Sequence, residues 1–110
     1  MAPQGSFHYE VEKSDDQYGH KLTTIKCHGR LVAENANEIT QLVKPMIPLG
    51  GRIVIDLGDV SYLDSSGLGA LVGLKVSAIN QGFCVLELVN MMPRVLELIR
   101  ITNLKQLFSS

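Results

Sequence analysis

A short apolar run in the middle of the chain, residues 52–57, constrains the fold more than any other feature. Its uninterrupted hydrophobic stretch is typical of a strand that is buried on both faces in a parallel sheet. Parallel strands need a long crossover between them, and a helix usually supplies it. Helical spacing is present on both sides of the run, at Ala36, Ile39 and Val43 before it and over residues 64–82 after it. The pattern therefore predicts an α/β domain.

The predicted elements are strands at 7–11, 22–27, 52–57 and 83–89, a last strand beginning at Leu107 and Phe108, and helices from Val32, over 65–82 and from Pro93. The first two strands form a hairpin across residues 14–20, and Pro45 ends or kinks the first helix. The last helix is expected to turn Val95, Leu96 and Ile99 inward. The 110 residues are thus predicted to form a single α/β domain with a small mixed sheet flanked by helices.

Composition narrows the function classes. Hydrophobic residues make up 45% and charged residues 19%, as in a packed globular chain. The net charge is −1, the basic residues are scattered and tryptophan is absent, which argues against nucleic-acid binding. A secretory leader and an apolar run of roughly 18 residues are both missing, so a cytoplasmic protein without a membrane partner is expected. Cys27 and Cys84 are predicted to be reduced thiols in the core.

The chemistry of the chain is concentrated in residues 56–69, D-L-G-D-V-S-Y-L-D-S-S-G-L-G. A loop at 58–63 is expected to lead into a helix whose N-cap is Asp64 or Ser65. Ser66 then falls in the first turn, where unpaired amides and the helix dipole favour negative charge. A phosphate there would add about 1.5 to 2 negative charges. A partner adapted to the unmodified hydroxyl would therefore reject the phosphorylated form.

Glycines follow this serine. Gly67 is expected to leave the flank of Ser66 open to another protein, and Gly69 and Gly73, one turn apart, to leave a smooth strip on the helix. The alternative is purely structural, because serines at helix starts usually act as caps and glycines in helices usually permit close packing.

Three runs of residues resemble a known family. Ile55-Asp56-Leu57, the stretch from Val60 to the D-S-S-G-L-G motif ending at Gly69, and Gly29-Arg30-Leu31 closely resemble the STAS domain, which bacterial anti-sigma factor antagonists share with the tails of sulfate transporters. The resemblance extends from the first strand to Phe108 and implies a single-domain STAS fold for residues 1–110. Family members commonly continue into a further helix, so a trimmed or excised module is expected.

The resemblance implies a non-enzymatic switch of the anti-sigma factor antagonist (anti-anti-sigma factor) type. In that family the second serine of the D-S-S-G motif, here Ser66, is phosphorylated by a partner that is both a serine kinase and an anti-sigma factor. The unphosphorylated form binds this kinase and frees the sigma factor for transcription, and a serine phosphatase resets the switch. Ser65 is expected to be a neighbour or helix cap, and Asp56 and Asp64 to shape the loop. The remaining expected partner-binding residues are Gly67, Leu68 and Gly69.

Two other functions stay open. Residues 67–73, G-L-G-A-L-V-G, come within one position of the dinucleotide-binding pattern G-x-G-x-x-G, and some STAS domains are reported to bind guanine nucleotides. A scaffold module of a larger signalling or transporter protein is the second alternative. An acidic metal pocket of Asp56, Asp59 and Asp64 has little support, because it needs further acids from a second strand. We expect no catalytic residue, metal or cofactor.

Overall fold

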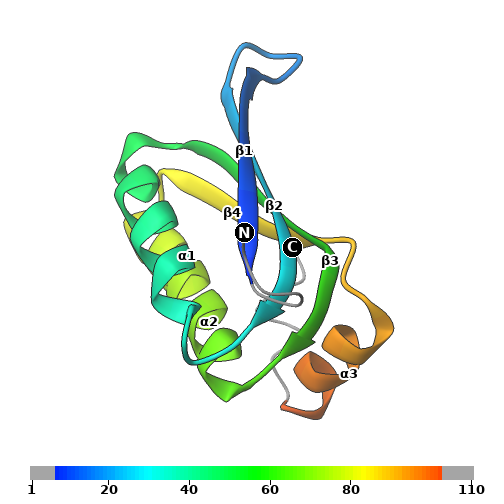
Figure 1. Cartoon of the computed structure of the whole chain (residues 1–110). Helices are drawn as coiled ribbons and strands as arrows, with labels where there is room; N and C mark the ends of the chain where they lie inside the picture. Colours follow the sequence, from blue (N-terminus) through cyan, green and yellow to red (C-terminus); the bar gives the residue numbers. More distant parts are fainter. Residues whose placement is uncertain (1–6, 103–110) are drawn as a thin grey trace.

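A computed structural model describes residues 7–102 as one four-stranded sheet with helices packed against it (Figure 1). The elements are β1 (His8–Asp15), β2 (Lys21–Leu31), α1 (Ala36–Val43), the 3-10 helix η1 (Lys44–Leu49), β3 (Gly51–Leu63), α2 (Ser65–Gln81), β4 (Cys84–Val89) and α3 (Pro93–Ile101). The strand order is β1-β2-β3-β4, with β1 antiparallel to β2 and the other pairs parallel. The predicted mixed sheet flanked by helices is confirmed. The strand expected at Leu107 and Phe108 lies outside the described residues.

The two crossover helices pack on the same face of the sheet. α1 connects β2 to β3 and α2 connects β3 to β4, and both crossovers advance across the sheet in the same direction. Figure 1 shows α1 and α2 side by side, whereas α3 stands apart beside the carboxyl end of β3. The strand residues buried in the shared core include Ile25, Cys27, Ile53, Ile55, Leu57, Leu86 and Leu88.

Burial raises the pKa of the Cys27 thiol to about 12, with the negative charge of Asp56 adding to the effect. Cys27 and Cys84 are both free and buried, as predicted.

The prediction of a loop at 58–63 is wrong, because β3 continues to Leu63. The pairing with β2 shifts register twice, between Lys26 and His28 and again between Gly29 and Arg30, and β3 contributes one extra residue each time. Such bulges break the two-residue alternation by which a strand is recognised in a sequence. Val60 and Leu63 are nevertheless buried, so this part of β3 also belongs to the core.

Smaller differences concern the helices. The first helix begins at Ala36 rather than Val32, because the amide of Val32 donates to Asn35 Oδ1 in a turn that precedes it. Pro45 acts as predicted, since the α-helical geometry ends at Val43 and the chain continues as η1. Leu96, expected to point inward, is 43% exposed, whereas Val95 and Ile99 of α3 are buried in the core as predicted. No helix within residues 7–102 is both long and apolar enough to cross a membrane.

The first turn of α2 touches the end of β2 through Gly67. A Cβ atom at Gly67 would overlap the carbonyl oxygen of Leu31 and lie 2.9 Å from Leu63 Cδ1. Gly67 is therefore buried, and the expectation that it leaves the flank of Ser66 open to a partner is wrong. Its missing side chain instead permits close packing, which fixes where α2 begins relative to the sheet.

We expect Gly67→Ala to lower the free energy of unfolding by about 2 kcal/mol, because the new methyl group meets backbone that cannot move aside. Gly69→Ala is the matched control, since nothing lies within 4 Å of its added Cβ. That change should raise the stability by up to about 1 kcal/mol through helix propensity. Urea unfolding of the two variants and the wild type measures both effects. Equal or greater stability of Gly67→Ala would contradict the close contact with Leu31.

Candidate functional site

Asp64 anchors the start of α2. It is the N-cap residue, and its Oδ1 accepts a hydrogen bond of 2.8 Å from the Gly67 amide. Its Oδ2 accepts one of 3.0 Å from the amide of Ala33 in the loop after β2, and its own amide donates to the Leu31 carbonyl at 3.3 Å. The Gly67 amide first, then the Ala33 and Ser66 amides and the charge of Arg30, hold the pKa of Asp64 below its usual value. Of the two predicted caps, the structure therefore selects Asp64.

The loop that Asp64 holds is itself ordered by side chains. Asn35 Oδ1 accepts from the Val32 amide at 2.9 Å, and Asn35 Nδ2 donates to the Arg30 carbonyl at 3.0 Å. The Arg30 guanidinium lies 5.1 Å from the centroid of the Tyr62 ring, within the range of a cation–π contact. A positively charged group is thus placed at the end of the sheet that carries the start of α2. Arg30 and Tyr62 are register partners across β2 and β3, a relation that sequence spacing does not reveal.

Ser65 and Ser66 occupy the first turn of α2, and both are exposed. Within the described part of the chain, neither hydroxyl has a hydrogen-bond partner. The expectation that Ser66 lies in the first turn of a helix is confirmed. Its hydroxyl is accessible, and the fold does not use it as a cap.

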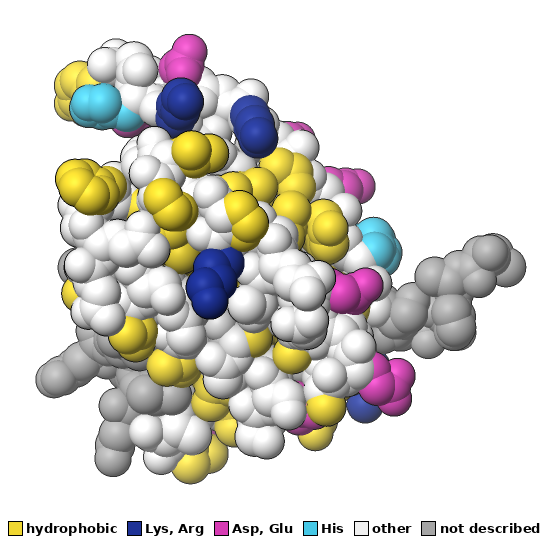
Figure 2. All heavy atoms as spheres, turned by 90° about the vertical axis from the view of Figure 1, so that its left-hand side faces the viewer, with side chains coloured by type: hydrophobic (Ala, Val, Ile, Leu, Met, Phe, Trp, Pro, Cys, Tyr) yellow, Lys and Arg dark blue, Asp and Glu magenta, His cyan; other side chains and the backbone are white. Residues whose placement is uncertain are grey.

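A shallow groove begins one turn further along α2. Gly69 and Gly73 are exposed, and an added Cβ at either would meet open space. The groove has a volume of about 270 Å³ and is lined by Thr40, Lys44, Gly69, Ala70, Gly73, Leu74 and Ser77 of α1 and α2. Figure 2 shows this side of the molecule with one basic side chain near its centre and the acidic groups near its margins, and Lys44 is the charged residue of the groove lining. The smooth strip expected from Gly69 and Gly73 is present, whereas Leu68 is only 7% exposed and belongs to the core rather than to a contact surface.

Asp56 and Asp59 lie away from Ser66. Asp56 pairs with Lys26 and Val89 in the middle of the sheet, eight residues before Asp64, which is about 20–25 Å along a strand. Its Oδ1 accepts from the amide of Gly58, the first residue of the segment predicted as a loop, at 2.8 Å, and so braces a bulge of β3 there.

Asp59 interacts with His28 of β2. Asp59 Oδ2 lies 2.6 Å from His28 Nδ1, and the His28 side chain is only 23% exposed. The hydrogen bond that His28 donates to Asp59 raises the pKa of His28, and Glu10 adds to the effect. Among residues 7–102, no group of three His, Cys, Asp or Glu side chains is arranged to hold a metal ion.

The sequence matches the profile of the STAS domain over residues 10–110. The chain belongs to the STAS domain family. An anti-sigma-B factor antagonist of Staphylococcus aureus (strain NCTC 8325) is 36% identical over 88 residues, which cover 79% of this chain and 81% of that protein.

Solved structures share the fold. An anti-sigma factor antagonist from Mycobacterium paratuberculosis superposes with a TM-score of 0.75 at 20% identity, covering 98% of this chain and 87% of that one. Unphosphorylated SpoIIAA gives a TM-score of 0.72 at 20% identity, covering 90% and 84%. The phosphorylated form of SpoIIAA from Bacillus gives 0.68 at 19% identity, covering 90% and 86%. The STAS fold predicted from the sequence is therefore confirmed.

The glycine pattern of residues 67–73 does not form a phosphate-binding loop in this STAS domain. All seven residues are inside α2, where the backbone amides are committed to the helix beyond its first turn. A dinucleotide-binding motif instead needs the glycines in the turn between a strand and a helix. The near match to G-x-G-x-x-G thus gives nucleotide binding no structural support.

We expect Asp64→Asn to lower the urea midpoint at pH 7, because the amide side chain offers one acceptor oxygen where the carboxylate offers two. The folded-state pKa of Asp64 lies below the ordinary value of 3.8, so its stabilisation is complete above pH 3.8 and is lost as the pH falls through the lower folded value. The difference between variant and wild type should accordingly shrink toward pH 2. Glu34→Gln, an exposed charge removal in the same loop, is the control. The assignment fails if both variants behave alike at pH 7.

Proposed function

We propose that this STAS domain is an anti-sigma factor antagonist that is switched at Ser66. In its unphosphorylated form it binds an anti-sigma factor with serine kinase activity and thereby releases a sigma factor, and phosphorylation of Ser66 ends that binding. The observation that carries the proposal is the exposed, unpartnered hydroxyl of Ser66 in the first turn of α2, next to a shallow groove whose lining contains no acidic side chain. The names of its relatives, and the existence of SpoIIAA in phosphorylated and unphosphorylated forms, support the same function.

The fold is compatible with a phosphate at Ser66. The amides of the first turn and the dipole of the 17-residue helix α2 favour negative charge there. Arg30 lies near Asp64 and offsets part of the added charge, while the Asp64 carboxylate opposes it. Because the core residues below the first turn do not contact the hydroxyl, phosphorylation would change the surface rather than the fold.

The partner would respond strongly to that change. A partner surface that fits the groove and the unmodified Ser66 hydroxyl would have to bury a group of about 1.5 to 2 negative charges after phosphorylation. Burying an unpaired charge costs several kcal/mol, and each 1.4 kcal/mol weakens binding about tenfold. Such a partner needs no conformational change in this domain to distinguish the two states. In this proposal the domain catalyses nothing itself, a serine phosphatase restores the hydroxyl, and the exchange takes place in the cytoplasm, where sigma factors act.

We expect one phosphate to be added when the protein is incubated with ATP and a kinase-competent extract of its own organism. Intact-mass analysis should show a single addition in the wild type and in Ser65→Ala, and none in Ser66→Ala. The modified peptide should map to the D-S-S-G segment. A phosphate that persists in Ser66→Ala would move the switch to another residue, and no phosphate on any variant would remove the phosphoacceptor role.

We expect Ser66→Asp to weaken binding to the anti-sigma factor at least about a hundredfold, because a partner surface that fits the neutral hydroxyl must then bury a carboxylate. Ser14→Asp adds the same charge to an exposed position on the hairpin, far from α2, and should bind like the wild type. Isothermal titration with the unmodified protein and both variants measures the difference. Similar affinities for Ser66→Asp and Ser14→Asp would place the partner elsewhere on the surface.

A further inference from the structure

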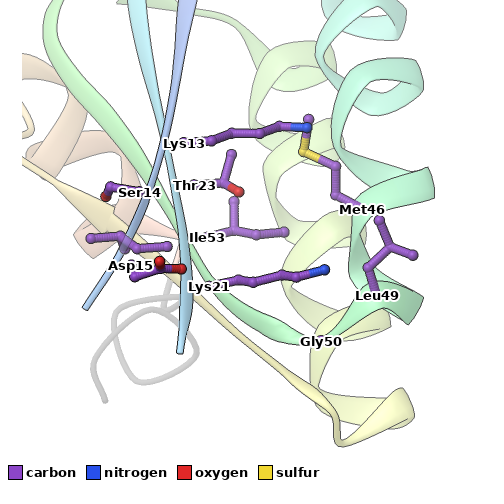
Figure 3. Close-up of a pocket in the computed structure, with 10 residues that line it drawn as sticks. Lys13, Ser14, Asp15, Lys21, Thr23, Met46, Leu49, Gly50 and Ile53 are labelled. Atoms are coloured by element: carbon purple, nitrogen blue, oxygen red, sulfur yellow. The ribbon is translucent and has the colours of Figure 1, made fainter. Parts of the chain in front are cut away.

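The hairpin of β1 and β2 overhangs the rest of the sheet. Leu22 of β2 pairs with Arg52 near the start of β3, so the tip of the hairpin, from Asp15 to Lys21, extends beyond the paired part of the parallel strands. Figure 1 shows this projection at the end of the molecule opposite the start of α2. Below the overhang lies a cavity of about 340 Å³, closed on its other side by η1 (Figure 3). That volume is at the lower end of the roughly 300–1,000 Å³ found for small-molecule sites.

A close backbone contact fixes the end of the cavity. Gly51 has a φ of +85°, and an added Cβ would lie 2.7 Å from the carbonyl oxygen of Lys21. The turn between η1 and β3 can therefore approach the hairpin only because both Gly50 and Gly51 adopt positive φ values. The shape of the cavity follows from the backbone and does not depend on flexible side chains alone.

One wall of the cavity is cationic. Lys13 and Thr23 are register partners in the hairpin, so their side chains lie on the same side of the sheet. Lys21 precedes Thr23 by two residues in β2 and therefore lies on that side too. In Figure 3 both lysine side chains extend across the cavity toward η1, and the Thr23 hydroxyl lies between them. Neither lysine forms an ion pair with any residue of the described range 7–102. Asp15 also lines the cavity, so the two ammonium groups and one carboxylate leave a positive balance.

The rest of the lining is mostly apolar. Ile53 is the register partner of Thr23 in the sheet and is 2% exposed, while Met46 of η1, across the cavity, contributes a flexible thioether that adapts to different shapes. Leu49 is 69% exposed, which is unusual for so large an aliphatic side chain next to a cavity. An apolar ligand group that covers this side chain would remove apolar surface from water, which favours binding.

We propose that this cavity binds a small amphiphilic organic anion, in which a phosphate or carboxylate is attached to a compact apolar body. The ammonium groups of Lys13 and Lys21 and the Thr23 hydroxyl hold the anionic group, and Met46 and Leu49 contact the apolar body. This site is separate from the switch at Ser66. It lies at the first residue of β3, whereas Ser66 follows the last residue, so both sites are accessible at once.

The test uses the full chain labelled with ¹⁵N and two probes, 1-naphthyl phosphate and 1-naphthoate, in NMR titrations. Neutral 1-naphthol and inorganic phosphate are the comparison ligands. We expect the amides of Lys13, Thr23 and Gly50 to shift with at least one naphthyl anion, and that anion to bind at least about tenfold more tightly than either comparison ligand. The tighter of the two anions identifies the preferred head group. Binding should weaken as the salt concentration rises.

Matched variants assign the effect to the lysines. Lys13→Gln and Lys21→Gln should each weaken binding of the naphthyl anion about tenfold. Lys44→Gln, which removes the same charge outside the cavity, should leave the affinity unchanged. The amide spectrum of each variant confirms that it is folded, and the two lysine variants are independent tests. The proposal is overturned if 1-naphthol binds as tightly as the anions, if the shifts map to other residues, if both lysine variants bind like the wild type, or if millimolar probe causes no shift.

Discussion

The contact between Asp64, Gly67 and the end of β2 determines where the functional surface lies. One carboxylate accepts hydrogen bonds from both the first turn of α2 and the loop after β2. The missing side chain of Gly67 lets the helix approach the Leu31 carbonyl. Together these interactions set the position of the first turn relative to the sheet. Ser66 is therefore presented by a rigid junction, although its own side chain takes no part in holding it.

Local interactions explain what could be predicted from the sequence. Helix ends depend on residues within one turn, so Asp64, Gly82 and Pro45 marked them correctly. The apolar run before the bulges identified β3 as a buried strand, and the position of Ser66 in the first turn followed from the cap. The second half of β3 was missed because two extra residues break its alternation, and their placement depends on the pairing with β2. Pairing of this kind involves residues about thirty positions apart and leaves no periodic signal.

The same reason explains the errors in the site. Asp56 was expected to shape a loop at 58–63, but these residues continue β3, so Asp56 lies in the middle of the strand. For Gly67, an open flank and close packing were both compatible with the sequence, and only the tertiary contact with Leu31 decides between them. Arg30 and Tyr62 come together through their register in β2 and β3. The Gly29-Arg30-Leu31 run pointed to this segment but assigned it no role.

The separation of the two proposed sites limits how they can influence each other. The hairpin cavity and Ser66 are joined by the length of β3 and α2, whose inward residues belong to one tightly packed core. A ligand below the hairpin cannot cover Ser66 directly, and its charge is screened by salt over a distance greater than a Debye length of about 8 Å. It could alter partner binding only by binding two conformations of the domain with different affinity. The hydroxyl of Ser66 is already exposed without such a change. The geometry therefore favours an anion site that acts independently of the serine switch, with each site occupied according to its own ligand.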